Sequence, residues 1–321
     1  MKKMRLSVDD AHEFAFRAAR KAGASEQVAT SLARATVSAE ERGKNPVGFK
    51  HLLDYLDGLA RGRIDGRAQP EVRFPTDASI QVDARGGIAQ AGFDSAFEQL
   101  VSRTTLHGVC VFAQSNGYTA GELGYYTTRL AEEGLVAIAG TNSHAIMGTV
   151  ESRQPVYGTN PLSFAAPMTN GASFVLDQAC SATAFVNVRQ AAANGEPIPE
   201  DWALDKSGEP TTNADDAVEG TLLPFGGWRG ANIALMIEIL AAGLTGGNWS
   251  LDAPSFAVGT ESPAVGLFVV ALAPVTGFAA RLQSHLERLK GYGMRIPGTR
   301  SRVDEVEISD ALAAKIREVT D

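Results

Sequence analysis

The sequence predicts an α/β or α+β protein, in which a central sheet domain is joined to a helical N-terminal part. Two observations lead to this prediction. From residue 72 to residue 271, short apolar and partly β-branched runs alternate with stretches of helical periodicity. The 321 residues are 44% hydrophobic and 21% charged, a globular composition with enough apolar residues for a large core. The length suggests about two domains or one large α/β unit.

The N-terminal part favours three helices. Their expected ranges are 7–23, 25–40 and 49–62. Ser7, followed by Asp10, is a capping-box-like start for the first helix, and Ser25 caps the second. Gly23 and Gly62 are the expected stops of the first and third helices. A loop at 43–48 separates the second helix from the third.

Five apolar runs predict strands, several of them buried on both faces. They lie at 80–82, 109–113, 135–139, 174–176 and 265–271. Further helices are expected at 92–105, 121–133, 182–194 and 230–245, and in the tail at 278–290 and 308–320. The C-terminus can join the N-terminal helices around the sheet.

Charge and composition exclude several function classes. A net charge of −8 argues against a nucleic-acid partner. No apolar run approaches the roughly 18 residues of a transmembrane helix, and acidic residues stand where a signal peptide needs its apolar stretch. Two cysteines and five scattered histidines support neither a disulfide framework nor a metal site. We therefore expect a cytoplasmic protein without a nucleic-acid or membrane partner.

Four Gly/Thr/Asn/Ser/Pro-rich turns follow predicted strand ends. They lie at 140–144, 157–161, 177–181 and 222–230. Loops at strand ends commonly carry ligand sites, but these residue types are also what any turn needs. The chain has no G-x-G-x-x-G after a strand, no P-loop, no G-x-S-x-G and no H-E-x-x-H. A standard Rossmann turn is therefore not expected.

Together these segments resemble the malate/L-lactate dehydrogenase-like oxidoreductases. This family includes ureidoglycolate, sulfolactate and 2,3-diketogulonate enzymes and the Δ1-piperideine-2-carboxylate/Δ1-pyrroline-2-carboxylate reductases. The resemblance is carried by AEERG at 39–43, Tyr55, GRID at 62–65, GYY at 124–126, TNS at 141–143, GTNP at 158–161, LD at 176–177, IPEDWA at 198–203, PTT at 210–212, the stretch 222–247 and RIPG at 295–298.

The resemblance implies an NADH- or NADPH-dependent oxidoreductase that interconverts a small anionic 2-oxo acid of malate, lactate or sulfolactate type and its 2-hydroxy acid. It also implies a non-Rossmann α/β fold with a central mixed sheet, a helical domain formed by N- and C-terminal segments, and a homodimer. On this basis we expect a helical substrate-side domain at 1–72 plus 290–321, and an α/β cofactor-binding domain at 73–289.

The departures from the family pattern concern the proton donor. The family usually reads Ser-His-Gly where this chain has Pro46-Val47-Gly48, and His51 stands where an Arg would hold the substrate carboxylate. Thr119 stands where another histidine is common. His51 lies one helical turn after Val47 and is expected on the same face, so its side chain could reach the volume that a histidine at position 47 would fill. His144 follows the turn that lies at the nicotinamide in the family, so His51, Thr119 and His144 are the catalytic candidates.

Further site residues follow from the resemblance. The substrate side would comprise Lys44, Pro46, Val47, His51 and Thr159. The cofactor side would comprise Ser143, Asp177, Gln178, Ala179, Ser181, Trp228, Arg229, Pro297, Gly298 and Thr299. Arg229 could face a phosphate oxygen. The plainer interpretations are a partly buried helix histidine beside Asp54 for His51, a surface cation for Arg229, and packing for Cys180.

Two other functions stay open. A cyclic imine carboxylate reductase would form proline or pipecolate from Δ1-pyrroline-2-carboxylate or Δ1-piperideine-2-carboxylate. The nitrogen of its substrate is already protonated, so this reaction has less need of a histidine as proton donor. The missing histidines therefore favour this function. A non-catalytic dinucleotide or metabolite binder would also lack these histidines.

Overall fold

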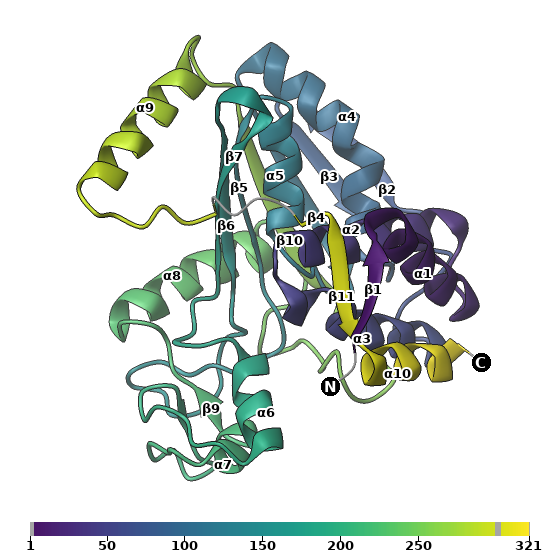
Figure 1. Cartoon of the computed structure of the whole chain (residues 1–321), viewed down its shortest axis with the longest axis vertical. Coiled ribbons are helices and arrows are strands. Elements are labelled where there is room, and N and C mark those ends of the chain that lie inside the picture. Colours follow the sequence, from purple (N-terminus) through teal and green to yellow (C-terminus); the bar gives the residue numbers. More distant parts are fainter. Residues whose placement is uncertain (1–2, 299–302, 321) are drawn as a thin grey trace.

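The computed structural model describes residues 3–298 and 303–320, and its N- and C-terminal segments form one helical body (Figure 1). Helices α1 (Val8–Lys21), α2 (Glu26–Glu41) and α3 (Phe49–Ala60) pack with the C-terminal helix α10 (Asp310–Thr320). Strand β1 (Lys3–Ser7) pairs antiparallel with β11 (Glu305–Ser309). The tail therefore joins the N-terminal helices, as the sequence predicts.

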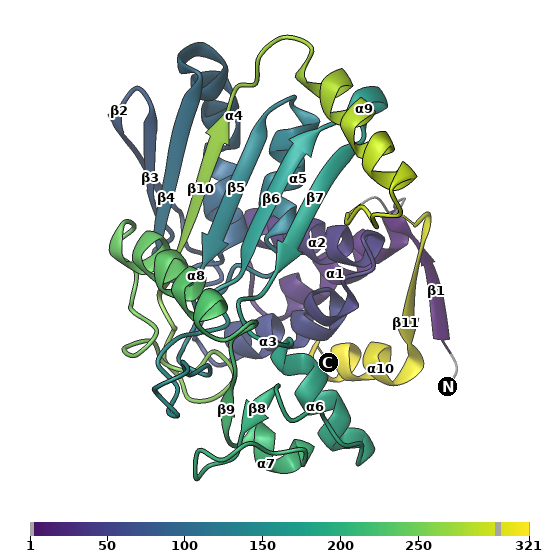
Figure 2. The same ribbon diagram turned by 90° about the vertical axis from the view of Figure 1, so that its left-hand side faces the viewer.

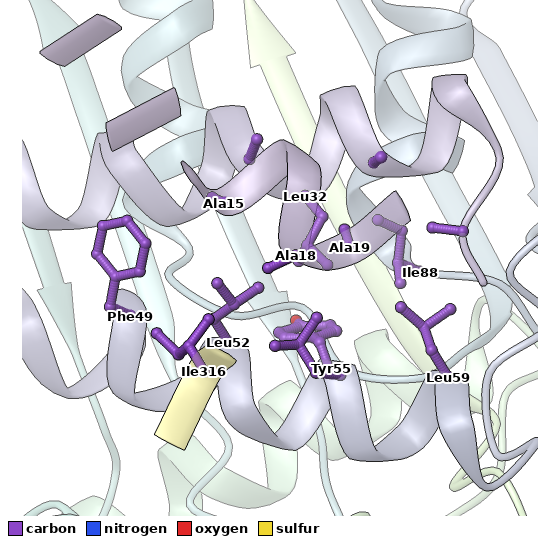
Figure 3. Close-up of a cluster of buried hydrophobic side chains, with 14 of the residues drawn as sticks. Ala15, Ala18, Ala19, Leu32, Phe49, Leu52, Tyr55, Leu59, Ile88 and Ile316 are labelled. Atoms are coloured by element: carbon purple, nitrogen blue, oxygen red, sulfur yellow. The ribbon is translucent and has the colours of Figure 1, made fainter. Parts of the chain in front are cut away.

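The core of this body is built from small residues on α1 and larger ones on α2 and α3 (Figure 3). Ala15 and Ala18 leave room for Leu32 and Leu52, and Tyr55 lies in the same cluster. The predicted caps are confirmed: Ser7 Oγ accepts from the N–H of Asp10 at 3.1 Å, and Ser25 Oγ accepts from that of Val28 at 3.3 Å.

The second body is a mixed sheet whose strand order is β2-β3-β4-β10-β5-β6-β7 (Figure 2). Its strands are β2 (Glu71–Thr76), β3 (Ser79–Asp83), β4 (Val109–Gly117), β5 (Val136–Thr141), β6 (Leu162–Pro167), β7 (Ser173–Gln178) and β10 (Val265–Leu272). The β3–β4 pair is parallel and the other pairs are antiparallel.

Helices cover the two faces of the sheet unequally. On one face α4 (Ala89–His107) and α5 (Gly124–Glu132) pack closely. On the other lie α8 (Trp228–Glu238), the π-helical turn η3 (Ile239–Gly243) and α9 (Phe278–Gly291). A smaller lobe beyond β7 contains α6 (Phe185–Asn194), β8 (Ala203–Leu204), α7 (Ala214–Val218) and β9 (Thr221–Leu222) around its own apolar cluster.

The sequence prediction was wrong at several element boundaries. The tail helix starts at residue 310 rather than 308, because 305–309 pairs with β1. The helix expected at 230–245 begins at Trp228 and gives way to a π-helical turn at Ile239. The sequence analysis predicted no strand at the positions of β1, β2, β6, β8, β9 and β11. The domain boundaries at residues 72, 73, 289 and 290 stay a prediction.

Candidate functional site

His51 lies on the first turns of α3 and is hydrogen-bonded through both ring nitrogens. Nδ1 is 2.8 Å from Asp54 Oδ2, and Nε2 is 3.3 Å from Thr119 Oγ1. Only 13% of the His51 side chain is exposed. Since Nδ1 donates its hydrogen to the Asp54 carboxylate, Nε2 is the ring nitrogen that can gain or lose a proton, on the side of Thr119. The structure thus brings together two of the three catalytic candidates, His51 and Thr119.

Tyr55 fixes the position of Thr119. The Thr119 hydroxyl donates to Tyr55 Oη at 2.7 Å, and Tyr55 Oη donates to the Thr119 carbonyl at 3.1 Å. Gln90 Nε2 also donates to Tyr55 Oη, at 2.9 Å. Burial raises the pKa of Tyr55 well above its ordinary range, so its hydroxyl stays protonated. The tyrosine therefore orients the threonine rather than titrating.

The third catalytic candidate, His144, is linked to His51 through the ring of Phe256, which contacts both histidines. The Phe256 ring lies edge-on to both histidines, with ring centroids 5.6 Å from His51 and 5.3 Å from His144. Burial lowers the pKa of His144, so its ring is neutral near pH 7. Its buried Nδ1 has no hydrogen-bond partner in the described part of the chain.

One step of the sequence argument was wrong. Val47 belongs to a short 3-10 turn, η1 (Asn45–Val47), and is not on the helix that carries His51. Gly48, with ψ −127°, separates the turn from α3. The i, i+4 relation between Val47 and His51 therefore does not hold, although both residues, with Pro46, lie in the same half-buried segment.

Glu40 at the end of α2 defines where α3 begins. Its Oε1 accepts from the N–H of Phe49 at 2.8 Å, and its Oε2 accepts from Asn45 Nδ2. Burial raises the pKa of Glu40. A Cβ on Gly48 would lie 2.2 Å from Glu40 Oε1, so only glycine fits beside this carboxylate. The glycine and the glutamate together set the first turn of α3 and so the position of His51.

A charged cluster at the end of β7 connects the substrate and cofactor candidates. Lys44 Nζ donates to the Asp177 carbonyl at 3.2 Å, and Asp177 Oδ2 accepts from the N–H of Gly124 at 3.0 Å. Arg42 binds Glu122 through two hydrogen bonds of 2.9 and 2.6 Å. Desolvation, with the nearby Glu122 carboxylate, raises the pKa of Asp177 to about 6.

The predicted ligand turns lie against one another. A Cβ on Gly158 would lie 2.3 Å from Ser143 Oγ, so these two turns touch. The N–H of Cys180 donates to the Thr159 carbonyl at 2.8 Å. The Cys180 carbonyl in turn accepts from the N–H of Phe225 at 2.9 Å. Ser143, Thr159 and the 177–181 turn, which contains Gln178, Ala179 and Ser181, are therefore close neighbours of the turn before α8.

The turn before α8 exposes its backbone. Gly226 and Gly227 have φ of +55° and +61°, which favour glycine. A Cβ on Gly230 would lie 2.2 Å from the Phe225 carbonyl oxygen. Trp228 and Arg229 follow as exposed side chains at the start of the helix. The described residues provide no hydrogen-bond or ion-pair partner for the guanidinium of Arg229, whose backbone N–H donates to the Gly226 carbonyl at 3.4 Å.

Pro297 and Gly298 also reach this region. A Cβ on Gly298 would lie 2.0 Å from the carbonyl oxygen of Val175, so this turn rests on β7 two residues before Asp177. Thr299 lies outside the described residues.

Sequence reasoning missed two supports of the site. One is Phe256, which no motif signals because a lone aromatic residue in a loop has many roles. The other is a buried network in which Glu238 accepts from Ser250 Oγ at 2.7 Å and from Asn160 Nδ2 at 2.8 Å, while Ser250 Oγ accepts from the N–H of Gly158 at 3.1 Å. The available signal in the sequence was a glutamate within an otherwise apolar helical stretch, Glu238. Cys180 is buried, and burial raises the pKa of its thiol to about 12, as expected of a packing residue.

Comparison with known proteins identifies the family. The profile of the malate/L-lactate dehydrogenase family matches residues 6–308. The chain belongs to this family. It is 36% identical to the Δ1-pyrroline-2-carboxylate/Δ1-piperideine-2-carboxylate reductase of Pseudomonas putida over 303 residues, 92% of this chain and 89% of the relative. It is 35% identical to the (2R)-3-sulfolactate dehydrogenase (NADP+) of Chromohalobacter salexigens over 324 residues, 97% of each chain.

A solved structure confirms the fold. The Δ1-piperideine-2-carboxylate reductase from Pseudomonas syringae superimposes with a TM-score of 0.93 and 33% identity, covering 98% of this chain and 99% of that one. The predicted family, its mixed-sheet fold and the class of NAD(P)-dependent dehydrogenases and reductases are therefore confirmed.

Residues 3–298 and 303–320 contain neither a candidate membrane-spanning helix nor a candidate metal site. No helix in these ranges is both long and apolar enough to cross a membrane. Within the same ranges, no group of three or more His, Cys, Asp or Glu side chains is placed to hold a metal ion.

Proposed function

We propose that the protein is an NADH- or NADPH-dependent reductase of a small cyclic imine carboxylate of the Δ1-pyrroline-2-carboxylate or Δ1-piperideine-2-carboxylate class. The observation that carries the substrate class is the state of the two site histidines. His51 is bonded through both nitrogens, and the pKa of His144 is lowered by burial. A protonated imine brings its own proton, so its reduction needs no separate acid.

The residues present fit a nicotinamide dinucleotide. The turn at 226–228 offers exposed backbone beside the cation Arg229, as phosphate groups require. The buried Nδ1 of His144, next to Ser143, has no hydrogen-bond partner in the described residues, so it can bind a polar group of the ligand. When bound, the dinucleotide supplies the hydride. We propose that the dinucleotide is held by residues of these turns, namely Ser143, Asp177, Gln178, Ala179, Ser181, Trp228, Arg229, Pro297, Gly298 and Thr299.

The chain's own residues then have distinct tasks. Lys44 and His51 face an anionic substrate from the loop before α3 and from its first turns, with Pro46, Val47 and Thr159 beside them. Asp54 holds the Nδ1 proton of His51, and Thr119 presents a hydroxyl to Nε2. Tyr55 keeps that hydroxyl in place.

A second candidate is the reduction of a 2-oxo acid. The 35% identity to a sulfolactate dehydrogenase over 97% of the chain favours it. In that reaction the pair of His51 and Thr119 would deliver the proton that the developing alkoxide needs.

The test is the oxidation of NADH and NADPH in the presence of Δ1-pyrroline-2-carboxylate, Δ1-piperideine-2-carboxylate, 3-sulfopyruvate, oxaloacetate and pyruvate. We expect turnover with the cyclic imines. Turnover with the 2-oxo acids alone would establish the second candidate. No turnover, combined with dinucleotide binding in calorimetry, would identify a non-catalytic binder. No binding of either dinucleotide would overturn both reductase candidates.

The assembly and location of the protein belong to the same proposal. We propose a homodimer, supported by the exposed large apolar side chains along α8 and η3, namely Trp228, Leu235, Met236 and Ile239. A cytoplasmic location, predicted from the sequence, can be tested by cell fractionation.

A further inference from the structure

The loop between η3 and β10 brings Phe256 into the site. This loop, residues 248–264, is held at several points: the Phe256 carbonyl accepts from Tyr118 Oη at 2.6 Å, and the Gly259 carbonyl accepts from Arg63 Nη1 at 2.9 Å. Asn248 Nδ2 donates to the Pro263 carbonyl at 3.1 Å, which closes the base of the loop. The backbone around Phe256 is therefore held in place by hydrogen bonds to both bodies of the molecule, in addition to the packing of its ring.

The ring of Phe256 is the element that the two site histidines share. Its interplanar angles are 89° with His51 and 73° with His144, and its centroid is 6.5 Å from that of Tyr118. The residue is only partly buried, although its ring also packs against the core of the helical body. The site therefore has an apolar aromatic surface between its two imidazoles.

We propose that Phe256 determines the substrate specificity of this site, favouring a substrate whose body is a hydrocarbon ring over one that carries a second anionic group. Methylene groups gain dispersion energy and lose water against an aromatic ring. A sulfonate or second carboxylate would lose its hydration against this ring, which offers no hydrogen-bond donor, and the negative face of the ring would oppose it. This inference rests on the proposed reductase function and names the residue that selects its substrate class.

The experiment compares the ratio of kcat/KM for Δ1-piperideine-2-carboxylate to that for 3-sulfopyruvate in four proteins. These are the wild type, Phe256→Ala, Phe256→Leu and the control Val258→Ala on the same loop, whose side chain is 67% exposed. We expect Phe256→Ala to lower the ratio at least tenfold, the order expected for lost apolar contact in a pocket. Phe256→Leu should retain most of the preference, and Val258→Ala should leave it unchanged.

A packing role would give a different result. If Phe256 only supports the fold, Phe256→Ala will lower the thermal midpoint and reduce both kcat/KM values in equal proportion, leaving the ratio intact. That outcome would overturn the inference. Where the wild type turns over only one of the substrates, the inhibition constant of the other supplies the comparison.

Failure of the proposed function can be told apart from failure of this inference. If the wild type reduces none of the substrates, calorimetric dissociation constants of L-pipecolate and L-malate for the dinucleotide-loaded protein give the same selectivity. A preference for L-pipecolate that Phe256→Ala abolishes would still support the inference, and equal effects on both ligands would contradict it.

Discussion

His51 is the residue on which the two candidate reactions make different demands. For a protonated imine we expect it to contact the substrate carboxylate, so His51→Gln should act mainly on KM, as loss of uniform binding does. For a 2-oxo acid it delivers a proton, and the same change should lower kcat by about 10²–10⁴. Steady-state kinetics with both substrates measures the split. His285→Gln on the exposed side of α9 is the control, and near-normal kcat/KM in His51→Gln would make His51 structural.

Arg229 provides a separate test of the cofactor side. Because its guanidinium is exposed and free of intramolecular partners in the described structure, Arg229→Ala should leave the fold unchanged. If the guanidinium meets a phosphate, the change should weaken dinucleotide binding by roughly 1.5–3 kcal/mol. Isothermal calorimetry with both dinucleotides measures it, beside Arg281→Ala on α9. An unaltered dissociation constant would return Arg229 to the solvated surface.

The raised pKa of Asp177 predicts that the free energy of unfolding depends on pH. Its folded pKa of about 6 lies above the unfolded value of 3.8, so between these pH values the folded chain binds more protons than the unfolded chain. The stability due to Asp177 is therefore present below pH 4 and is lost as pH rises towards 6. Glu122 adds to the shift, while Lys44 and Arg42 oppose it.

Asp177→Asn removes this dependence and keeps an oxygen for the N–H of Gly124. At pH 8, without dinucleotide, we expect its free energy of unfolding to exceed that of the wild type by about 1–2 kcal/mol, a value reduced to allow for partial solvent screening. At pH 4 the gain should vanish. Urea unfolding at both pH values measures this, with the exposed Asp252→Asn as control. A gain that did not change with pH would contradict the assignment.

At the scale of elements, the junction of α2 and α3 is set by Glu40 and Gly48. Gly48→Ala places a Cβ 2.2 Å from Glu40 Oε1, so the carboxylate must leave the N–H of Phe49. We expect a loss of about 1–3 kcal/mol in stability and a displaced His51. Gly291→Ala, with no atom near its Cβ, is the matched control and should be neutral or slightly stabilising. Equal unfolding midpoints for the two variants would show that the junction adapts.

The elements also show what sequence patterns could and could not predict. Helices with local signals, such as the serine caps of α1 and α2, were found because those signals act within one turn. Strands β1 and β11 were missed because each is short and depends on a partner some 300 residues away. The π-helical turn at Ile239 has no local code. Likewise, His51 could be proposed from sequence, but Phe256 joins it only through the fold.

At the scale of the whole molecule, the candidate site lies between the helical body and the sheet body. The helical body supplies His51 and Lys44, and the sheet body supplies Thr119, His144 and Asp177. Contacts such as that between Lys44 and Asp177 cross from one body to the other. A relative movement of the two bodies would therefore change the substrate side and the cofactor side together.

The exposed apolar face of α8 and η3 bears on the assembly of the molecule. Leu235, Met236 and Ile239 are 44%, 47% and 51% exposed, and residues 235 and 239 are one helical turn apart. Such a concentration is unusual on a monomer, so we expect the wild type to run as a dimer in size-exclusion chromatography with light scattering.

The double change Leu235→Glu and Ile239→Glu should yield a monomer with an unchanged circular dichroism spectrum, because both side chains already face outward. Charges brought together in an interface lose hydration without gaining partners, which opposes association. Val275→Glu, at an exposed site before α9, should leave the dimer intact. A monomeric wild type, or a double variant that remains dimeric, would show that this face does not form the interface.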